Sequence, residues 1–254
     1  MRALLDLATA TAAAAVARLA EATEAAGVRA EGHHDVKIDA DFLLHDFIGE
    51  RLRASGLPVL SEEDAVPVTT RGRRWIVDPL DGSLNFSRGL PFYGVSLALW
   101  DDDTPVLGVV HDAAGNERFA GLVGEGAWRD GVAIAVSPVA EPARAVLCTG
   151  FPAQTDHAEA AVGAFAAQVA AFRKVRCLGS AALSLAYVAC GRVDAYREDH
   201  IALWDVAAGI ALVRAAGGAA VFAPTPRGRQ TYRVAVTNGL LDAHALFQGR
   251  IGTS

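Results

Sequence analysis

The sequence is poor in cysteine, in clustered basic residues and in long uncharged segments, and each shortage excludes a class of protein. Its three cysteines, Cys148, Cys177 and Cys190, form no CxxC pair and have no closely spaced histidine partner. We therefore expect neither a zinc site nor a disulfide framework, and we expect a reducing, cytoplasmic location. The densest basic group is three arginines between positions 71 and 74, too few for a surface that binds a nucleic-acid polymer.

No segment of the sequence predicts a membrane span. The longest uncharged run, residues 177–191, is shorter than the roughly 20 residues that a bilayer requires, and it ends at Arg192. The alanine-rich N-terminus superficially resembles a signal peptide, but Asp6 falls where an apolar core should begin. We interpret it as the first helix of the mature protein.

The composition is that of an ordinary folded chain. It has 254 residues, of which 52% are hydrophobic, and a formal net charge of −6. A chain of this length can bury one core or two tightly joined halves, and the sequence contains no fixed repeat and no obvious linker. We predict one α+β domain over residues 1–254, with a subdomain seam near residue 140 that separates residues 1–140 from residues 141–254.

Periodicity locates the expected elements. Helical spacing of apolar residues predicts helices over 3–26, 40–54, 155–172, 180–190 and 203–216. Strand patterns occur at 57–61, 74–77, 94–100, 105–111, 117–122, 133–136, 145–149, 174–177, 193–196, 219–222 and 233–236. The acidic run at 101–103 separates two of these strands and is typical of a hairpin tip.

Acidic residues occur where several of these elements begin or end. The buried strand at 74–77 is followed by Asp78-Pro79-Leu80-Asp81-Gly82-Ser83, where proline and glycine predict that the strand stops in a turn. The turn gathers two carboxylates, and its Gly82 and Ser83 N–H groups can meet an anion. Taken alone, the same residues favour a simple capped turn, in which Asp78 and Asp81 only accept backbone hydrogen bonds.

Two other acidic positions have the same ambiguity. Glu62 and Glu63 end the apolar segment that begins at Leu57, and acids there can simply favour a helix start. Asp205 begins a helix that is rich in alanine and glycine, where an N-cap is the ordinary role.

Together these segments resemble the magnesium-dependent, lithium-sensitive phosphatases of the inositol monophosphatase family. The family motif D-P-[IL]-D-G-[ST]-x-N-F, which follows a strand, matches residues 78–86, and the motif that begins W-D-x-A-[AG]-G matches residues 204–218. The acidic pair at 62–63, the segment at 35–41, the GSAA segment at 179–182 and the DAYRE segment at 194–198 match further family positions in the same order.

The resemblance implies a fold and a metal centre. The fold would be a layered α/β/α/β/α sandwich of the inositol monophosphatase and fructose-1,6-bisphosphatase type, with two or three Mg²⁺ ions per active site at the seam between the halves. The first ion would be held by Glu62, Asp78 and the Leu80 carbonyl. The second would be held by Asp78, Asp81 and Asp205, and a third, weaker ion would share Glu62.

The resemblance also implies a mechanism, in which a water molecule activated by the metal attacks the phosphate directly. The implied catalytic residues are Asp41, Ser83 and Glu62, with Ser83 and Asp41 orienting the water and the N–H groups of Gly82 and Ser83 binding phosphate. Ser83 replaces the threonine that is usual in the family. Lys37 and Asp39 replace neutral residues, which is either a surface charge pair or a changed third-metal site.

The expected substrate is a small phosphate monoester, inositol monophosphate or a related polyol or sugar phosphate. By resemblance, Gly179, Ser180, Ala181 and Glu198 would bind it. The alternative for Glu198 is an ordinary strand-end acid paired with Arg197 or His200. The alternatives are a 3′(2′),5′-bisphosphate nucleotidase, a fructose-1,6-bisphosphatase, a histidinol-phosphate phosphatase and, in another class, a non-catalytic polyol-phosphate or metal sensor. Because family members are commonly homodimers, we also expect a homodimer.

Overall fold

The computed structural model describes residues 1–22, 28–31, 36–64, 71–151, 159–226 and 231–250. Its helices are α1 (Arg2–Ala22), α2 (Asp39–Arg53), α3 (Ser83–Ser87), α4 (Glu159–Ala171), α5 (Ala181–Ala189), α6 (Leu203–Ala215) and α7 (Ala243–Phe247), with a short turn, η1 (Pro142–Arg144). A small antiparallel hairpin, β1 (Val28–Glu31) and β2 (Val36–Ile38), precedes α2.

Two larger sheets form the framework of the described residues. The first has the order β3 (Val59–Ser61), β4 (Arg73–Asp81), β5 (Gly94–Asp101), β6 (Thr104–Asp112), β7 (Glu117–Leu122), β8 (Gly126–Arg129), β9 (Val132–Ile134). The second has the order β11 (Lys174–Arg176), β10 (Val146–Thr149), β12 (Ala195–Ala202), β14 (Thr231–Thr237), β13 (Ala219–Pro224). The chain passes from the first sheet to the second between Ile134 and Val146. The single domain over residues 1–254 and its subdomain seam near residue 140 stay a prediction.

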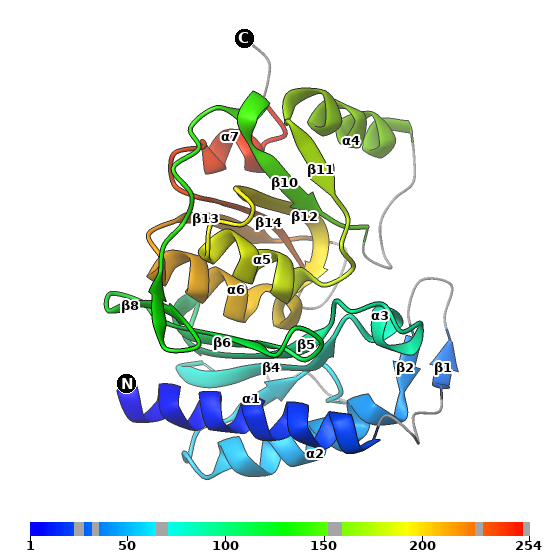
Figure 1. Cartoon of the computed structure of the whole chain (residues 1–254), viewed down its shortest axis with the longest axis vertical. Helices are drawn as coiled ribbons and strands as arrows, with labels where there is room; N and C mark the ends of the chain where they lie inside the picture. The colour runs from blue at the N-terminus through cyan, green and yellow to red at the C-terminus, as the bar shows by residue number, and fades with distance from the viewer. Residues whose placement is uncertain (23–27, 32–35, 65–70, 152–158, 227–230, 251–254) are drawn as a thin grey trace.

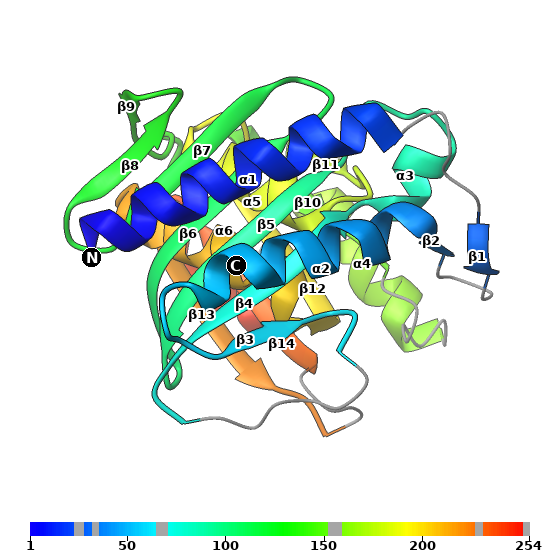
Figure 2. The ribbon, with the colours of Figure 1, turned by 90° about the horizontal axis from the view of Figure 1, so that it is seen from below.

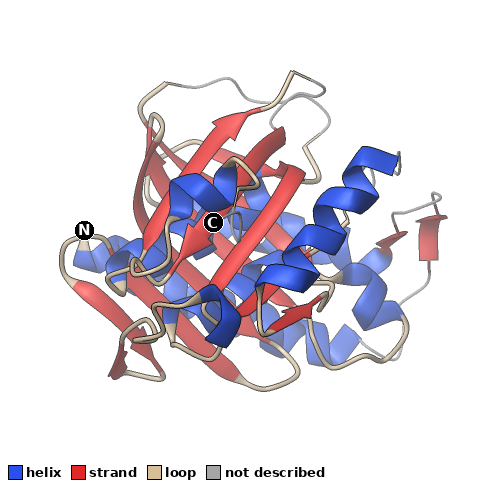
Figure 3. Ribbon diagram, turned by 90° about the horizontal axis from the view of Figure 1, so that it is seen from above, coloured by secondary structure: helices blue, strands red, loops and turns tan. Residues whose placement is uncertain are grey.

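The elements stack in five layers (Figure 1). From bottom to top of that view these are α1 with α2, the first sheet, α5 with α6, the second sheet, and α4 with α7. Seen from above, helices lie in front of the strands of the second sheet and further helices lie behind them (Figure 3). The expected α+β fold and its α/β/α/β/α order are therefore confirmed.

The bottom layer is held by a regular apolar stripe. α1 and α2 cross one face of the first sheet side by side (Figure 2). The fully buried apolar residues of α1 recur every three or four positions, as expected for one face of a helix: Leu5, Ala8, Ala12, Ala15 and Leu19. By length and composition alone α1 is apolar enough to cross a membrane. In this fold it lies in an outer layer and packs its buried stripe against the first sheet, with a third of the apolar window buried.

The middle layer depends on a close approach between a helix and a sheet. A Cβ added to Gly108 of β6 would lie 2.2 Å from the backbone oxygen of Ala208 in α6. Trp100 of β5 donates its indole N–H to the neighbouring Ala207 carbonyl at 3.2 Å. The first sheet therefore fixes how closely α6 approaches it and how α6 is rotated about its own axis. α6 is the helix that carries Asp205.

The expected elements are confirmed apart from their limits and a few short additions. The main correction concerns β4, which does not stop before Asp78 but continues to Asp81 through an irregularity in its pairing with β5. β12 is likewise longer than expected, and β8, α3, α7 and the β1–β2 hairpin were not predicted. Short elements of this kind carry too few residues for a periodic pattern. Residues 152–158, which open the helix expected at 155–172, lie outside the described residues.

The close approach at Gly108 leads to a stability prediction. Gly108→Ala should lower the free energy of unfolding by more than about 2 kcal/mol, because the new methyl group meets a backbone atom that cannot rotate away. The control is Gly163→Ala in α4, where an added Cβ meets nothing within 4 Å. This control should be neutral or stabilising by up to about 1 kcal/mol. Chemical denaturation measures both, and equal stability of the two variants would contradict the packing argument.

Candidate metal and phosphate site

Three carboxylates from separate elements converge at the boundary between the first sheet and the middle layer. Glu62 follows β3, Asp78 lies in β4 and Asp205 lies in the first turn of α6. One carboxylate oxygen from each lies within 4.8 Å of the others. Asp205 is not the N-cap of its helix, because that position belongs to Ala202. The group can hold a metal ion.

The local backbone explains why Glu62 and Asp78 meet. β3 and β4 are parallel and in register, with Ser61 opposite Val77, and the Glu62 N–H donates to the Val77 carbonyl at 3.1 Å. The residues that follow this pair, Glu62 and Asp78, are therefore neighbours. The Leu80 N–H donates to the Asp78 carboxylate at 3.0 Å, and this hydrogen bond closes a turn within the irregular segment of β4.

Asp81 connects this acidic group to the middle layer. Its carboxylate accepts hydrogen bonds from the Ser180 hydroxyl at 2.5 Å and from the Ala182 N–H at 2.7 Å. Ser180 is the N-cap of α5 and also accepts from the Leu183 N–H. The substrate segment expected at 179–181 is thus tied directly to an expected metal ligand.

The asparagine of the 78–86 motif has a structural role in the same region. Asn85 is buried, and its amide donates to the Phe92 carbonyl at 2.8 Å and to the Leu178 carbonyl at 2.9 Å. Gly82, with φ of 88°, is the N-cap residue before α3, and an added Cβ would lie 2.9 Å from the Phe92 oxygen. Only glycine fits that turn without strain. The Gly82–Ser83 backbone is therefore held tightly beside the acids.

Asp41 lies in the first turn of α2 and is buried, with 4% of its surface exposed. β2, just before α2, packs against α3, the helix that begins at Ser83. The fold therefore brings the Asp41 and Ser83 segments to the same side of the site. Asp35, at the start of the 35–41 segment, lies outside the described residues.

Glu198 faces a cavity and is not an exposed strand-end acid. It lies in β12, is 6% exposed and accepts a hydrogen bond from the Tyr196 hydroxyl. Its expected alternative partner Arg197 binds Asp199 instead, at 2.9 Å. A cavity of about 180 Å³ is lined by Asp81, Thr149, Gly150, Phe151, Gly179, Ser180, Ala181, Ser184, Tyr196, Glu198, Ile201 and Asp205. The cavity thus joins expected metal ligands to every expected substrate residue.

Burial and neighbouring negative charges disfavour the ionised forms of the acids in this site. Burial raises the pKa of Asp78 well above its usual value, and the negative charges of Glu62, Asp81 and Asp205 raise it further. The pKa of Asp205 is raised by the same two causes, first burial and then neighbouring acids. Crowded carboxylate oxygens are the donors that hard divalent cations prefer, and a bound cation would relieve this repulsion. The donor set therefore fits Mg²⁺.

Sequence reasoning missed part of the cavity wall. Thr149 ends β10, and Gly150 and Phe151 follow it; β10 lies beside β12 only in the folded sheet. An added Cβ at Gly150 would lie 2.7 Å from a Glu198 carboxylate oxygen, so glycine there makes room for that side chain. Nothing in the local sequence marks these residues. Tyr196, in contrast, lies within the matched DAYRE segment and could have been included.

Comparison with known proteins is consistent with this site. The family model described as the inositol monophosphatase family matches residues 1–249. The chain belongs to the inositol monophosphatase family. It is 38% identical over 208 residues to inositol monophosphatase 3 of Solanum lycopersicum, covering 79% of this chain and 73% of that protein. It is 40% identical over 187 residues to Nus factor SuhB of Xylella fastidiosa, covering 72% and 68%.

Solved structures of the family share the fold. The inositol monophosphatase from Anabaena (Nostoc) sp. PCC 7120 superposes with a TM-score of 0.82 at 33% identity, covering 98% of this chain and 95% of that chain. An enzyme of the phosphatase class is thereby supported for this member of the family.

The raised pKa values lead to a prediction for the metal-free protein. Burial raises the pKa of Glu198 to about 7 and that of Asp81 to about 6. Between their unfolded values and these values the folded state binds more protons than the unfolded chain, so stability falls as pH rises. In chelator, the melting temperature should therefore be lower at pH 8 than at pH 5. Excess Mg²⁺ should reduce or reverse this decrease of the melting temperature with rising pH. A melting temperature of the metal-free protein that rises with pH would contradict the electrostatic argument.

Proposed function

We propose that this protein is a magnesium-dependent phosphatase that hydrolyses a small phosphate monoester, inositol monophosphate or a related polyol or sugar phosphate. The observation that carries the proposal is the convergence of Glu62, Asp78 and Asp205 beside a cavity that also exposes Asp81 and Glu198. An acidic site of this kind can accept a phosphate dianion only together with cations. Family membership supports the reaction class.

We assign the ligands as the motifs suggest. One ion would be held by Glu62, Asp78 and the Leu80 carbonyl. A second ion would be held by Asp78, Asp81 and Asp205. A third, weaker ion would share Glu62. When bound, Mg²⁺ would neutralise the phosphate oxygens and lower the pKa of a coordinated water molecule. The three-acid group supports the first two positions, since Asp78 is central to both.

The protein's own groups would position the reactants. The Ser83 hydroxyl would accept a hydrogen bond from the attacking water and donate to the Asp41 carboxylate, which takes up the proton. The N–H groups of Gly82 and Ser83 would donate to phosphate oxygens. A bond forms between the water oxygen and phosphorus as the bond to the alcohol oxygen breaks. The leaving alkoxide takes a proton from solvent water and departs as the alcohol, without a covalent enzyme intermediate.

The substrate alcohol would occupy the cavity lined by Gly179, Ser180, Ala181 and Glu198. The buried Glu198 carboxylate is held by Tyr196 and has room to accept hydrogen bonds from substrate hydroxyl groups. We also propose a homodimer in the cytoplasm that binds neither a nucleic-acid polymer nor a membrane. A non-catalytic sensor is the second candidate, since some relatives are named for a Nus factor, but the complete set of acids favours the enzyme.

Phosphate release from inositol 1-phosphate at pH 8 tests the reaction. Wild-type protein should release phosphate with Mg²⁺ and not in chelator, and Asp78→Asn and Asp205→Asn should each lower kcat by at least about 100-fold, because each removes a metal ligand. The matched control is Asp46→Asn, an exposed acid of α2, which should keep wild-type activity. Full activity in either site variant would reject the ligand assignment. Tight ligand binding without turnover in the wild type would favour the sensor.

The role of Glu198 has its own test. Glu198→Gln should raise KM for inositol 1-phosphate about tenfold, because an uncharged acceptor binds hydroxyl groups less strongly, and it should leave the Mg²⁺ concentration for half-maximal rate unchanged. Relative kcat/KM values across polyol and simple alkyl phosphates provide the measurement. Identical relative rates in the variant and the wild type would exclude Glu198 from substrate binding.

A further inference from the structure

The strand that carries Glu198 contains one residue more than the strand beside it. β12 pairs Glu198 with Val234 of β14. The next pair along the two strands is Ile201 with Tyr232, so residues 199–200 of β12 face a single residue of β14. An extra residue of this kind is a β-bulge, which interrupts the regular alternation of side chains along a strand. The bulge lies between Glu198 and the start of α6.

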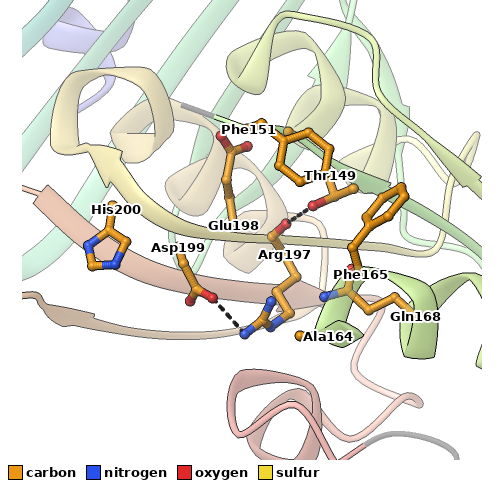
Figure 4. A pocket seen from close by; sticks show the side chains of 10 residues that line it. Thr149, Phe151, Ala164, Phe165, Gln168, Arg197, Glu198, Asp199 and His200 are labelled. Atoms are coloured by element: carbon orange, nitrogen blue, oxygen red, sulfur yellow. Dashed lines mark hydrogen bonds and ion pairs between the residues drawn. The ribbon is translucent and has the colours of Figure 1, made fainter. Parts of the chain in front are cut away.

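The bulge determines which side chains of β12 face the cavity of about 180 Å³ in the proposed active site, the first cavity. In a regular strand, residues three positions apart point to opposite faces of the sheet. Glu198 and Ile201 are three positions apart, yet both line the first cavity. Figure 4 shows Glu198 on one side of β12 and Arg197 and Asp199 on the other. The extra residue therefore keeps Glu198 and the segment that leads into α6 on one face.

The bulge lies where, among the described strands, β12 is paired on one side only. Pairing with β10 ends at Thr149 and Arg197. Residues 197–200 instead border a second cavity, with a volume of about 120 Å³, which lies beside α4 (Figure 4). Because there is open space on this side, close packing does not fix the bulge there. Its conformation depends on β14 and on polar contacts.

The backbone of the bulge is strained. His200 has φ of 63°, in the left-handed region that residues with a side chain disfavour. A strained conformation persists only where the surrounding structure holds it in place, and such conformations concentrate at functional sites. The bulge therefore needs contacts that prevent it from relaxing into a regular strand.

Asp199 provides such contacts. One of its carboxylate oxygens accepts a hydrogen bond from Arg197 at 2.9 Å, and the other accepts from Arg233 at 2.7 Å. Arg233 is the residue of β14 that stands opposite the bulge. Arg197 is buried and also donates to the Leu246 carbonyl at 3.0 Å. Asp199 thus ties the bulge to both strands, and each of its oxygens is engaged.

We propose that Asp199 is a positioning residue, which binds Arg197 and Arg233, holds the bulge of β12 and so aims the Glu198 carboxylate at the substrate alcohol. Asp199 acts through Glu198 alone. The metal ligand that follows the bulge, Asp205, is held separately, because contacts with the first sheet fix α6. The inference rests on the proposed substrate role of Glu198 and adds a second residue that determines the preference for polyol phosphates.

Asp199→Ala removes both ion pairs and tests the proposal. KM for inositol 1-phosphate should rise about fivefold, because Glu198 is no longer held in one orientation. For ethyl phosphate, which offers Glu198 no hydroxyl group, kcat/KM should change by less than about twofold. The Mg²⁺ concentration for half-maximal rate should stay at the wild-type value. A merely structural role would lower kcat/KM equally for both phosphates, and that result would overturn the proposal.

The matched control is Asp101→Ala, which also removes an ion pair between neighbouring strands. Asp101 accepts from Arg73 at 3.0 Å, and this pair is about as exposed as the pair of Asp199 with Arg233. The control should leave the values for both phosphates unchanged. In a Glu198→Gln background, Asp199→Ala should raise KM for inositol 1-phosphate by less than about twofold further. A full fivefold further rise would show that Asp199 does not act through Glu198.

Amide hydrogen exchange of the metal-free protein tests the bulge without any turnover. Exchange over residues 197–202 should be at least about tenfold faster in Asp199→Ala than in the wild type, and it should be unchanged in Asp101→Ala. Equal exchange in Asp199→Ala and the wild type would overturn the proposal, while phosphate release by the wild type would still support the proposed function.

A binding measurement covers the case in which the wild type releases no phosphate and the proposed function fails. The phosphonates that correspond to inositol 1-phosphate and ethyl phosphate, which cannot be hydrolysed, are titrated calorimetrically into the protein with Mg²⁺. A preference for the inositol compound that falls about fivefold in Asp199→Ala would support the positioning role. An unchanged preference would overturn it.

Discussion

Electrostatic repulsion among buried and partly buried carboxylates is the constraint on which the site depends. The charges of Glu62, Asp81 and Asp205 raise the pKa of Asp78, and those of Glu62 and Asp81 raise the pKa of Asp205. Gathering these acids lowers the free energy of unfolding unless protons or divalent cations compensate their charges. Much of the surrounding structure can be understood as a rigid support that keeps the acids together despite that repulsion.

The support comes from contacts between layers. Gly108 allows α6 to lie against the first sheet, and Trp100 hydrogen-bonds to the same turn of that helix. Asp81 is hydrogen-bonded to the start of α5, and Asn85 links the α3 segment to Leu178. Each contact crosses from one half of the chain to the other. The two halves therefore form the site jointly, and neither could position the acids by itself.

Two adjoining cavities differ in the residues of their walls. The first is lined by acids and backbone groups, whereas the second is lined by an aromatic pair, by two polar atoms that have no hydrogen-bond partner within the described residues, and by Arg197 in an ion pair with Asp199. Glu198 stands between them and is buried and held by Tyr196. Differences within a family that shares one metal centre can arise in such a neighbouring compartment, where side chains change without disturbing the acids.

The sequence by itself predicted the order of the main elements and, through its resemblance to the inositol monophosphatase family, the fold class and the acids of the candidate metal site. Long periodic segments locate the elements because periodicity depends on local spacing, whereas the 78–86 and 204–218 motifs carry the resemblance. The tertiary structure decided that β4 continues to Asp81, that Asp81 binds Ser180, and that Phe151, Phe165, Gln168 and His200 share one cavity. These residues are brought together by strand pairing and helix packing between distant segments, and such contacts leave no periodic trace along the chain.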